Sequence, residues 1–190
     1  NQRNSLISKL QNKKINVLIN NAAFVGTSNL KGWNTDFDKQ SLDTWSLCFE
    51  VNVTAVFHLC RDLFPILKKY SNSSIINISS MYGSLKHNKS YYKDLDMSVP
   101  AAYSASKGAL NQLTKWLSVE LAPFIRVNAI SPGGIFRNQD KVFIDRYEKQ
   151  TLMGRMATEK DIIGAMKFLV SEDSGYMTGE IININGGVYL

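Results

Sequence analysis

The stretch Ser74-Ile75-Ile76-Asn77-Ile78-Ser79 is a short apolar run bounded by polar residues, and it predicts a buried β-strand. Three similar runs are spread along the chain, at Asn16–Asn20, Ile125–Ile130 and Ile181–Ile184. Longer segments with a helical spacing of apolar residues separate most of these runs. Because neighbouring parallel strands need crossover connections, which are usually helices, this alternation predicts an α/β fold with a parallel sheet and helices on its faces.

Two of the separating segments, 41–69 and 101–121, predict amphipathic helices. We expect Ser41 to cap the first helix and Pro100 to open the second. The expected core-facing side of the first helix consists of Leu42, Trp45, Phe49, Val53, Val56, Phe57, Cys60, Phe64 and Leu67. That of the second consists of Ala105, Ala109, Leu113, Trp116, Leu117 and Leu121.

The last third of the chain contains one more predicted helix. Ser131-Pro132-Gly133-Gly134 ends the third strand, and the charged segment that follows is expected to be mobile. Thr158-Glu159-Lys160-Asp161 resembles a capping box, with Asp161 in place of the usual Glu or Gln, and it predicts a helix that continues to Val170.

Length and composition indicate one globular domain. The chain has 190 residues, of which 44% are hydrophobic and 20% charged, so we expect residues 1–190 to form a single unit. No run approaches the roughly 20 apolar residues that a membrane span needs. The first ten residues are polar and have no apolar central region of the kind that a secretory signal contains.

The cysteines and the charge exclude several other classes of protein. Cys48 and Cys60 provide neither a disulfide framework nor a metal-ligand cluster, so we expect no metal and a cytoplasmic location. The net charge is +6, but the basic residues are scattered, which favours solvated surface over nucleic-acid binding. A hypothesis of RNA binding rests on net charge alone, and would require affinity that falls steeply with salt.

The most specific chemical signal is Tyr103-Ser104-Ala105-Ser106-Lys107. Positions four apart lie on one side of a helix, so Tyr103 and Lys107 present their polar ends to the same space. A free phenol has a pKa near 10, which makes it a poor acid or base at neutral pH. A neighbouring ammonium group favours the phenolate, so we predict a lowered pKa that suits Tyr103 for general acid/base catalysis.

The context makes this pair more specific than a Tyr-x-x-x-Lys spacing alone, which is common on solvated helices. The preceding strand ends in Ser79-Ser80, and a serine hydroxyl there could hold a substrate oxygen beside the phenol. The alternative is that Ser80 is only a turn residue at the end of a strand. We favour the second serine of the pair as the functional one.

Over essentially all of its residues, the chain resembles the short-chain dehydrogenase/reductase family. Asn20-Asn21-Ala22-Ala23 is similar to the family's Asn-Asn-Ala-Gly motif, and Asn52, Ser80, Tyr103 and Lys107 match its catalytic tetrad in order. Three further motifs of the family are matched by Pro132-Gly133, by Tyr176-Met177-Thr178-Gly179 and by Asn185-Gly186-Gly187.

The resemblance implies a role for each tetrad residue. Tyr103 would exchange a proton with the substrate oxygen, Lys107 would lower the pKa of Tyr103 and hold the nicotinamide ribose, and Ser80 would orient the substrate. Asn52 would anchor a water that relays protons, although an asparagine within a helix can also bond a backbone carbonyl or face solvent. The resemblance implies NAD or NADP as cofactor, bound by Asn21, Ala22, Ala23, Tyr103, Lys107, Pro132, Gly133 and Ile135.

The chain departs from the family pattern on both the cofactor side and the substrate side. Ala23 replaces the usual glycine of the first motif. Arg137 stands where the family often has threonine, and could grip a phosphate or serve as a solvated arginine of a lid. The loop between Ser80 and Tyr103 is long and polar, and either contacts substrate or decorates the surface. The residues that we predict to bind substrate are Ser80, Tyr82, Tyr91, Tyr92 and Arg137.

The family's glycine-rich phosphate motif, Thr-Gly-x-x-x-Gly-x-Gly, does not occur in the sequence. The resemblance therefore implies a Rossmann-like doubly wound sheet, of which the chain supplies strands four to seven with their flanking helices, while the N-terminal strands are absent. We expect a fragment of a longer protein, and such a chain would bind a dinucleotide weakly or not at all. The alternative is a degenerate relative that uses half a sheet as a binding module.

The resemblance implies an NAD(P)-dependent oxidoreductase that interconverts a secondary alcohol and a ketone. The stretches Asn21–Trp33 and Pro132–Asn138 and the long loop resemble bacterial members of sugar biosynthesis, including flagellin and surface-glycan modification. A sugar-like small molecule is the expected substrate, with a fatty-acyl or steroid substrate as the alternative. A competing hypothesis is a non-catalytic binding or regulatory protein that keeps the scaffold.

By the same resemblance we expect a homodimer or homotetramer, with no nucleic-acid or membrane partner. The candidate contact residues are Phe57, Leu113, Trp116 and Tyr189. Core packing is the alternative for the first three. NAD or NADP preference and reaction direction do not follow from the sequence.

Overall fold

The computed structural model describes residues 2–25 and 30–188 of the chain. Four strands, β1 (Val17–Asn20), β2 (Ser73–Ile78), β3 (Ile125–Pro132) and β4 (Ile181–Ile184), form one sheet in the order β1-β2-β3-β4. Every neighbouring pair is parallel. The four predicted strands and the predicted parallel α/β architecture are therefore confirmed.

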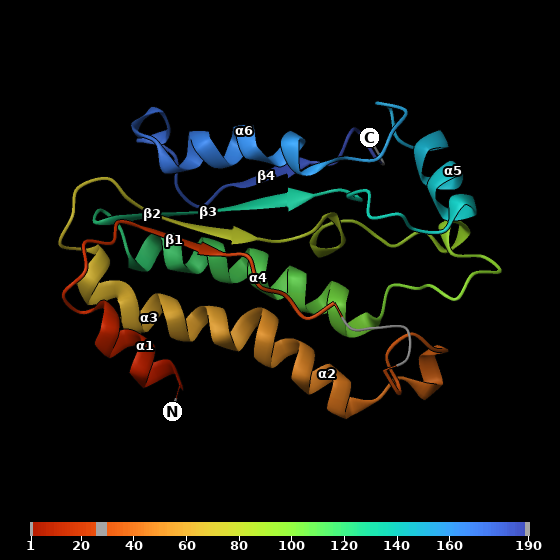
Figure 1. Cartoon of the computed structure of the whole chain (residues 1–190), viewed down its shortest axis with the longest axis horizontal. Coiled ribbons are helices and arrows are strands. Elements are labelled where there is room, and N and C mark those ends of the chain that lie inside the picture. Colours follow the sequence, from red (N-terminus) through yellow and green to blue (C-terminus); the bar gives the residue numbers. More distant parts are fainter. Residues whose placement is uncertain (1, 26–29, 189–190) are drawn as a thin grey trace.

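Helices cover both faces of this sheet, as Figure 1 shows. On one face lie α1 (Gln2–Leu10), α2 (Leu42–Phe49), α3 (Ala55–Leu67) and α4 (Ala101–Glu120). The opposite face is covered by α6 (Glu159–Val170), and α5 (Lys141–Lys149) lies beyond the carboxyl ends of the strands. Since the carboxyl ends of parallel strands meet at one edge, the loops after β1, β2 and β3 all open toward that edge.

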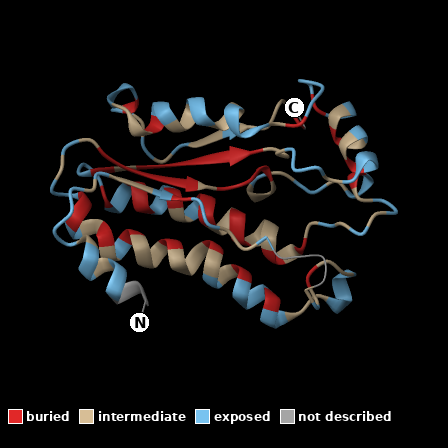
Figure 2. Ribbon diagram, in the orientation of Figure 1, coloured by how far each residue is buried: buried red, intermediate tan, exposed pale blue. Residues whose placement is uncertain are grey.

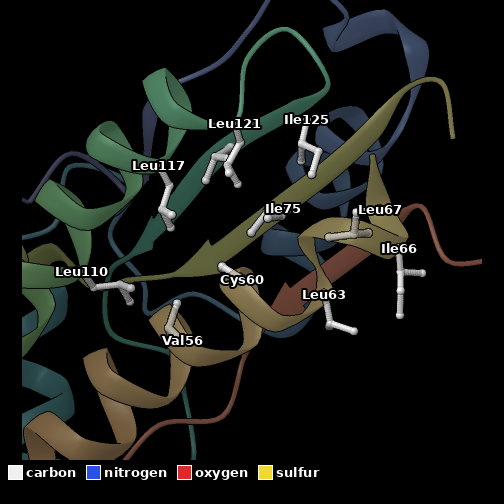
Figure 3. Packing of buried hydrophobic residues seen from close by; sticks show 11 residues of the cluster. Val56, Cys60, Leu63, Ile66, Leu67, Ile75, Leu110, Leu117, Leu121 and Ile125 are labelled. Carbon is white, nitrogen blue, oxygen red and sulfur yellow. The ribbon is translucent and has the colours of Figure 1, made fainter. Parts of the chain in front are cut away.

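The core consists of two apolar layers, one on each face of the sheet. Ile75 of β2 packs toward α3 and α4, where it meets Cys60, Leu110 and Leu117 (Figure 3). Its neighbour Ile76 points to the other face, because successive strand residues alternate, and it joins the cluster under α6. Figure 2 shows that β2 and β3 are buried along most of their length.

The segment 41–69 is helical, as predicted, but it is not one regular α-helix. A π-helical turn, Glu50–Thr54, separates α2 from α3. Ser41 caps α2 as predicted, accepting a hydrogen bond from the Asp43 backbone N–H at 3.1 Å. The predicted core-facing side was partly wrong, since Leu42 is 80% exposed. The side chains buried in this segment are Thr44, Cys48, Asn52, Val56, Cys60, Leu63, Ile66 and Leu67.

The π-helical turn explains this difference. Buried residues recur every four positions from Thr44 to Cys60. In a regular α-helix such a series would rotate around the axis by about 40° at each step. The wider turn at Glu50–Thr54 offsets part of that rotation, so the series stays on the buried side, where Cys48 and Asn52 contact Ser106 of α4, and polar Asn52 is carried into the interior.

Two further expectations are corrected. On α4 the buried residues include Ser106, Lys107 and Thr114, whereas Trp116 from the predicted core-facing side is 51% exposed. The charged segment after Gly134, expected to be mobile, contains the ordered helix α5, whose buried aromatic residues pack against the loop that precedes α4. The capping box at Thr158 is confirmed and starts α6. Within the part of the chain that the structure describes, no helix is long and apolar enough to cross a membrane.

The core layer under α4 gives a test of the fold. Leu110 is 1% exposed within this layer, so Leu110→Ala should lower the free energy of unfolding by about 2–5 kcal/mol, because it removes buried methyl groups and leaves a cavity. The matched control Leu42→Ala should change it by less than about 0.5 kcal/mol. Urea denaturation measures both, and equal losses would contradict the assigned core.

Candidate active site

The four tetrad-like residues come from three segments near the carboxyl end of β2. Tyr103 and Lys107 lie in the first two turns of α4, Ser80 directly follows β2, and Asn52 lies in the π-helical turn. Ser80 caps a short 3-10 turn through the Tyr82 backbone N–H at 3.2 Å, so it is a turn residue as well as a candidate catalytic group.

Lys107 is buried between α4 and the end of β2. Its side chain is 2% exposed, and its Nζ donates a hydrogen bond to the carbonyl oxygen of Ile78 at 2.8 Å. The same nitrogen lies 5.8 Å from the centroid of the Tyr103 ring. The structure therefore brings the two side chains together on one side of α4, with the ammonium group near the face of the ring.

The pKa of Tyr103 differs from the sequence-based expectation. Burial raises the pKa of the phenol, and a hydrogen bond with Ser80 opposes that rise. The hydrogen bond brings Ser80 and Tyr103 together, as the tetrad pattern predicts. The expected lowering by Lys107 is wrong, because the effect of burial dominates and Lys107 directs its N–H at Ile78.

Lys107 is itself perturbed by its surroundings. Burial lowers the pKa of its ammonium group to about 8, and a smaller interaction with Cys48 opposes this change. Cys48 and Cys60 are both buried free thiols, and burial raises the pKa of each. At neutral pH the site therefore contains a neutral phenol, a mostly charged lysine and neutral thiols.

Asn52 connects this site to the loop that follows β1. Its Oδ1 accepts a hydrogen bond from the Phe24 backbone N–H at 2.6 Å, and its Nδ2 donates to the Phe24 carbonyl at 3.2 Å. Nδ2 also lies 3.0 Å from Ser106 Oγ, which donates to the Tyr103 carbonyl. Asn52 thus makes the backbone contacts that the alternative interpretation expected, and its water-relay role stays a prediction.

The residues expected to bind a dinucleotide lie at the carboxyl ends of β1 and β3. Asn21 and Ala22 are exposed after β1, and Pro132–Gly134 turns the chain after β3. A Cβ at Gly133 would lie 2.7 Å from the Tyr147 hydroxyl and 2.9 Å from Asn185 Cα. The backbone after β1 is thus open to a ligand, whereas the space beside Gly133 is filled by Tyr147 and Asn185 of the protein itself. The half-buried Ile135 continues this turn and forms a bridge with Ala157.

The residues expected to bind substrate have separate surroundings. The hydroxyl groups of Tyr82 and Tyr92 are 2.6 Å apart, and both side chains are partly exposed. Tyr91 is fully buried among Phe143 and other aromatic residues, so its predicted contact with substrate is wrong. The reason is that α5, absent from the sequence-based prediction, covers this part of the loop.

Arg137 lies on the surface. Its Nη1 is 2.8 Å from a carboxylate oxygen of Glu159, and both side chains are more than half exposed. This ion pair favours the interpretation of Arg137 as a solvated arginine over a phosphate-binding role.

A cleft of about 850 Å³ opens beside the first turns of α4. One wall is the loop before α4, with His87, Lys89, Tyr92 and Lys93, and another is the segment that includes Phe37 and Gln40. Ser104 and Ala105 of α4 also line it. Among the residues that the structure describes, no cluster of three or more His, Cys, Asp or Glu could hold a metal ion.

Sequence reasoning missed Tyr147 and Ser106. Tyr147 of α5 is buried and contacts the turn after β3, and Ser106 joins Asn52 to α4. Ser106 could have been found, because it lies within the Tyr103–Lys107 motif and three residues after Tyr103. Nothing in the sequence marks Tyr147 before α5 is placed.

Comparisons with known proteins agree with this fold. The model of a family described as enoyl-(acyl carrier protein) reductase matches residues 2–189. Cyclopentanol dehydrogenase of Comamonas testosteroni is 32% identical over 184 residues, which cover 93% of this chain and 67% of that protein. Post-translational flagellin modification protein A of Campylobacter coli is 34% identical over 128 residues, or 67% of this chain and 50% of that protein.

A solved structure is similar along almost the whole chain. The crystal structure of a short chain dehydrogenase from Leptospira borgpetersenii with bound NAD+ has a TM-score of 0.87 and 32% identity, over 98% of this chain and 70% of that one. The chain therefore belongs to the short-chain dehydrogenase/reductase family. It is an oxidoreductase of the kind that acts on CH–OH groups.

The burial of Lys107 predicts a pH dependence of stability. The pKa is about 8 in the folded protein and near 10.5 in the unfolded chain, so between these values the unfolded chain binds more protons. The free energy of unfolding should therefore rise with pH from about 8 to about 10, by up to about 1.4 kcal/mol per pH unit. Above pH 10 the raised pKa of Tyr103 acts in the opposite direction, because the folded state then retains a proton that the unfolded chain has lost.

Lys107→Met isolates this contribution, because methionine fills similar space without titrating. Urea denaturation of both proteins across the window should give a difference in unfolding free energy that changes with pH. Parallel pH profiles for the two proteins would show that Lys107 keeps its ordinary pKa in the folded state.

Proposed function

We propose that the protein catalyses an NAD(P)-dependent interconversion of a secondary alcohol and a ketone, with Tyr103 as general acid/base. The observation that carries this proposal is the convergence of Ser80, Tyr103 and Lys107 at the carboxyl end of β2. Membership of the short-chain dehydrogenase/reductase family supports it. The bound dinucleotide would supply or accept the hydride at the substrate carbon.

The protein's own groups would manage the substrate oxygen. In the direction of reduction, the Tyr103 hydroxyl donates its proton to the ketone oxygen as the carbon becomes a carbinol. Burial raises the pKa of Tyr103, so the protonated, donating form is present at neutral pH. The Ser80 hydroxyl shares the site with the phenol and orients the same oxygen. Lys107, mostly charged at neutral pH, stabilises the phenolate that remains.

The cofactor would lie along the loops at the carboxyl edge of the sheet. Its binding residues in this proposal are Asn21, Ala22, Ala23, Tyr103, Lys107, Pro132, Gly133 and Ile135. Lys107 gives one N–H to Ile78, and an ammonium group has three donors, which leaves capacity for a ribose hydroxyl. In this scheme β1–β4 correspond to strands four to seven of the family's sheet, an assignment that rests on the order of the motifs. The choice between NAD and NADP stays open.

A sugar-like substrate is the finer part of the proposal. The cleft beside α4 combines amide, phenol and amine groups from Gln40, Tyr92 and Lys93 with aromatic Phe37, a mixture that suits a polyhydroxylated ring. The similarity to a flagellin modification protein is compatible with a sugar substrate. Similarity to a cyclopentanol dehydrogenase favours a plain alicyclic alcohol instead. Turnover of a panel of sugar, alicyclic and acyl substrates would decide between these classes.

We further propose a homodimer or homotetramer in the cytoplasm. Trp116 is 51% exposed on α4, so core packing does not account for it, and Phe57 and Leu113 are partly exposed. Tyr189 lies outside the described residues. Two free buried thiols suit a reducing compartment. Light scattering that shows only monomer at micromolar concentration would contradict the oligomer.

Tyr103→Phe tests the proposed chemistry in the full-length protein. The substitution removes the exchangeable proton but keeps the ring, so turnover should fall by at least about 100-fold while NADH affinity changes by no more than about threefold. The control Tyr176→Phe changes a fully exposed tyrosine and should retain activity. Steady-state kinetics and NADH fluorescence titration measure the two effects.

Retained turnover in Tyr103→Phe would remove Tyr103 from the mechanism. A wild-type protein that neither binds NADH nor oxidises any alcohol in the panel would favour the competing function, a non-catalytic binding protein on the family scaffold.

A further inference from the structure

One buried tyrosine of α5 joins two segments of the candidate active site. Tyr147 is 1% exposed, and its hydroxyl oxygen accepts a hydrogen bond from the Gly134 backbone N–H at 2.6 Å. The same hydroxyl donates to the sulfur of Met81 at 3.7 Å. Gly134 belongs to the turn after β3, and Met81 directly follows Ser80. A single side chain therefore links the turn that we expect to face the cofactor with the residue that follows the candidate catalytic serine.

The turn and the tyrosine fit each other closely. A Cβ at Gly133 would lie 2.7 Å from the Tyr147 hydroxyl, and one at Gly134 would lie 2.9 Å from its Cζ. Both distances are far shorter than ordinary carbon contacts of about 3.5–4.0 Å. Any larger residue at either position would displace the phenol or the turn. The second glycine of Pro132-Gly133-Gly134 is thus explained by the ring that packs against it.

Contacts independent of Gly134 hold α5 in place. The Tyr147 ring lies 5.3 Å from that of Tyr91, and the Phe143 ring of α5 lies 5.3 Å from that of Tyr92, measured between centroids. Arg146, next to Tyr147 in α5, donates to the carbonyl of Lys93 at 2.5 Å. These contacts fasten α5 to the loop before α4, so the Tyr147 hydroxyl is a fixed acceptor for the turn.

We propose that Tyr147 is a positioning residue that sets the backbone of the turn after β3 for dinucleotide binding. This inference rests on the proposed function, in which Pro132 and Gly133 contact the cofactor. A backbone N–H held by a buried phenol keeps one orientation, and a turn with one orientation loses less entropy when a ligand binds. The loop before α4 lines the cleft and packs against Tyr147. The same tyrosine therefore connects this loop to the turn after β3.

Tyr147→Phe tests this role, because it removes the hydroxyl and keeps the ring. The Gly134 N–H would lose its acceptor, so its amide hydrogen should exchange at least about tenfold faster in the ligand-free protein. In the full-length protein the dissociation constant for NADH or NADPH should rise about three- to tenfold. The Michaelis constant for the cofactor should rise by a similar factor, and kcat should fall by less than about threefold.

Phe143→Leu is the matched control. Phe143 is 5% exposed in the same aromatic cluster, and its side chain carries no hydrogen-bonding group, so this change loosens packing without removing the bond to Gly134. It should lower the melting temperature at least as much as Tyr147→Phe, yet leave Gly134 exchange and cofactor affinity within about twofold of wild type.

Each outcome decides the proposal. If Tyr147→Phe leaves Gly134 exchange or cofactor affinity unchanged while the wild-type protein binds cofactor, the positioning role is refuted and the proposed function stands. The same holds if Phe143→Leu weakens cofactor binding as strongly as Tyr147→Phe. A wild-type full-length protein that binds neither NADH nor NADPH would refute the proposed function and, with it, this role.

Discussion

The geometry of the candidate site depends on a buried ammonium group bonded to the end of a strand. Lys107 Nζ lies 2.8 Å from the carbonyl oxygen of Ile78, and its side chain is almost fully removed from water. Removing a charge from water is costly unless the charge is hydrogen-bonded, so a lysine is tolerated here only while α4 stays against β2. Tyr103 lies one turn earlier on the same side of α4. The contact that satisfies the lysine therefore also sets where the phenol lies relative to Ser80.

The residues on either side of Ile78 strengthen this arrangement. Asn77 of β2 donates a hydrogen bond to Thr114 at 2.9 Å, and Ser79, directly after β2, donates to Asn111 at 2.5 Å. Together with Ile78, three successive residues at the end of β2 are thus bonded to side chains along α4. Apolar burial is not directional, whereas a hydrogen bond demands both a distance and an angle. The apolar residues of α4 hold the helix to the sheet, and this polar stripe fixes its rotation about its own axis.

Sequence reasoning predicts the strands and the helix starts well, but it misses buried polar residues such as those of this stripe. Short runs rich in apolar residues, such as Ser74–Ser79, identify the strands, because a strand covered on both faces lacks the alternation of apolar and polar residues seen in half-exposed strands. The capping signals at Ser41 and Thr158 are local and are found directly. The side of each helix that faces the core is predicted less well. A search for apolar periodicity passes over Asn52 and Lys107, because these buried residues are polar.

In the candidate site, too, the residues fixed by local spacing are predicted, and a residue placed by a distant contact is not. The positions of Ser80, Tyr103 and Lys107 follow from motif spacing, because a strand end and one helix side determine them. Tyr91 was assigned to substrate because polar aromatic residues in a long loop resemble a binding surface. Its burial depends on Phe143 of α5, a contact across more than 50 residues of chain, and no local pattern records such a contact.

The sign of the Tyr103 pKa change shows most clearly why spacing does not determine chemistry. A four-residue spacing brings an ammonium group near a phenol, but the pKa depends on the balance between that charge and the loss of water. Here the lysine directs its N–H at Ile78, and burial of the phenol prevails, so the pKa of Tyr103 is raised. A raised pKa keeps the phenol protonated but makes it a weaker acid, so proton donation to a ketone oxygen leaves a phenolate that needs stabilisation. Oxidation of an alcohol requires the opposite transfer, so it needs further stabilisation of the phenolate. Cys48 cannot supply that stabilisation, because burial raises the pKa of its thiol and keeps it neutral. In either direction of the reaction the phenolate form of Tyr103 must be stabilised, and the Lys107 ammonium group lies near enough to the ring to do so.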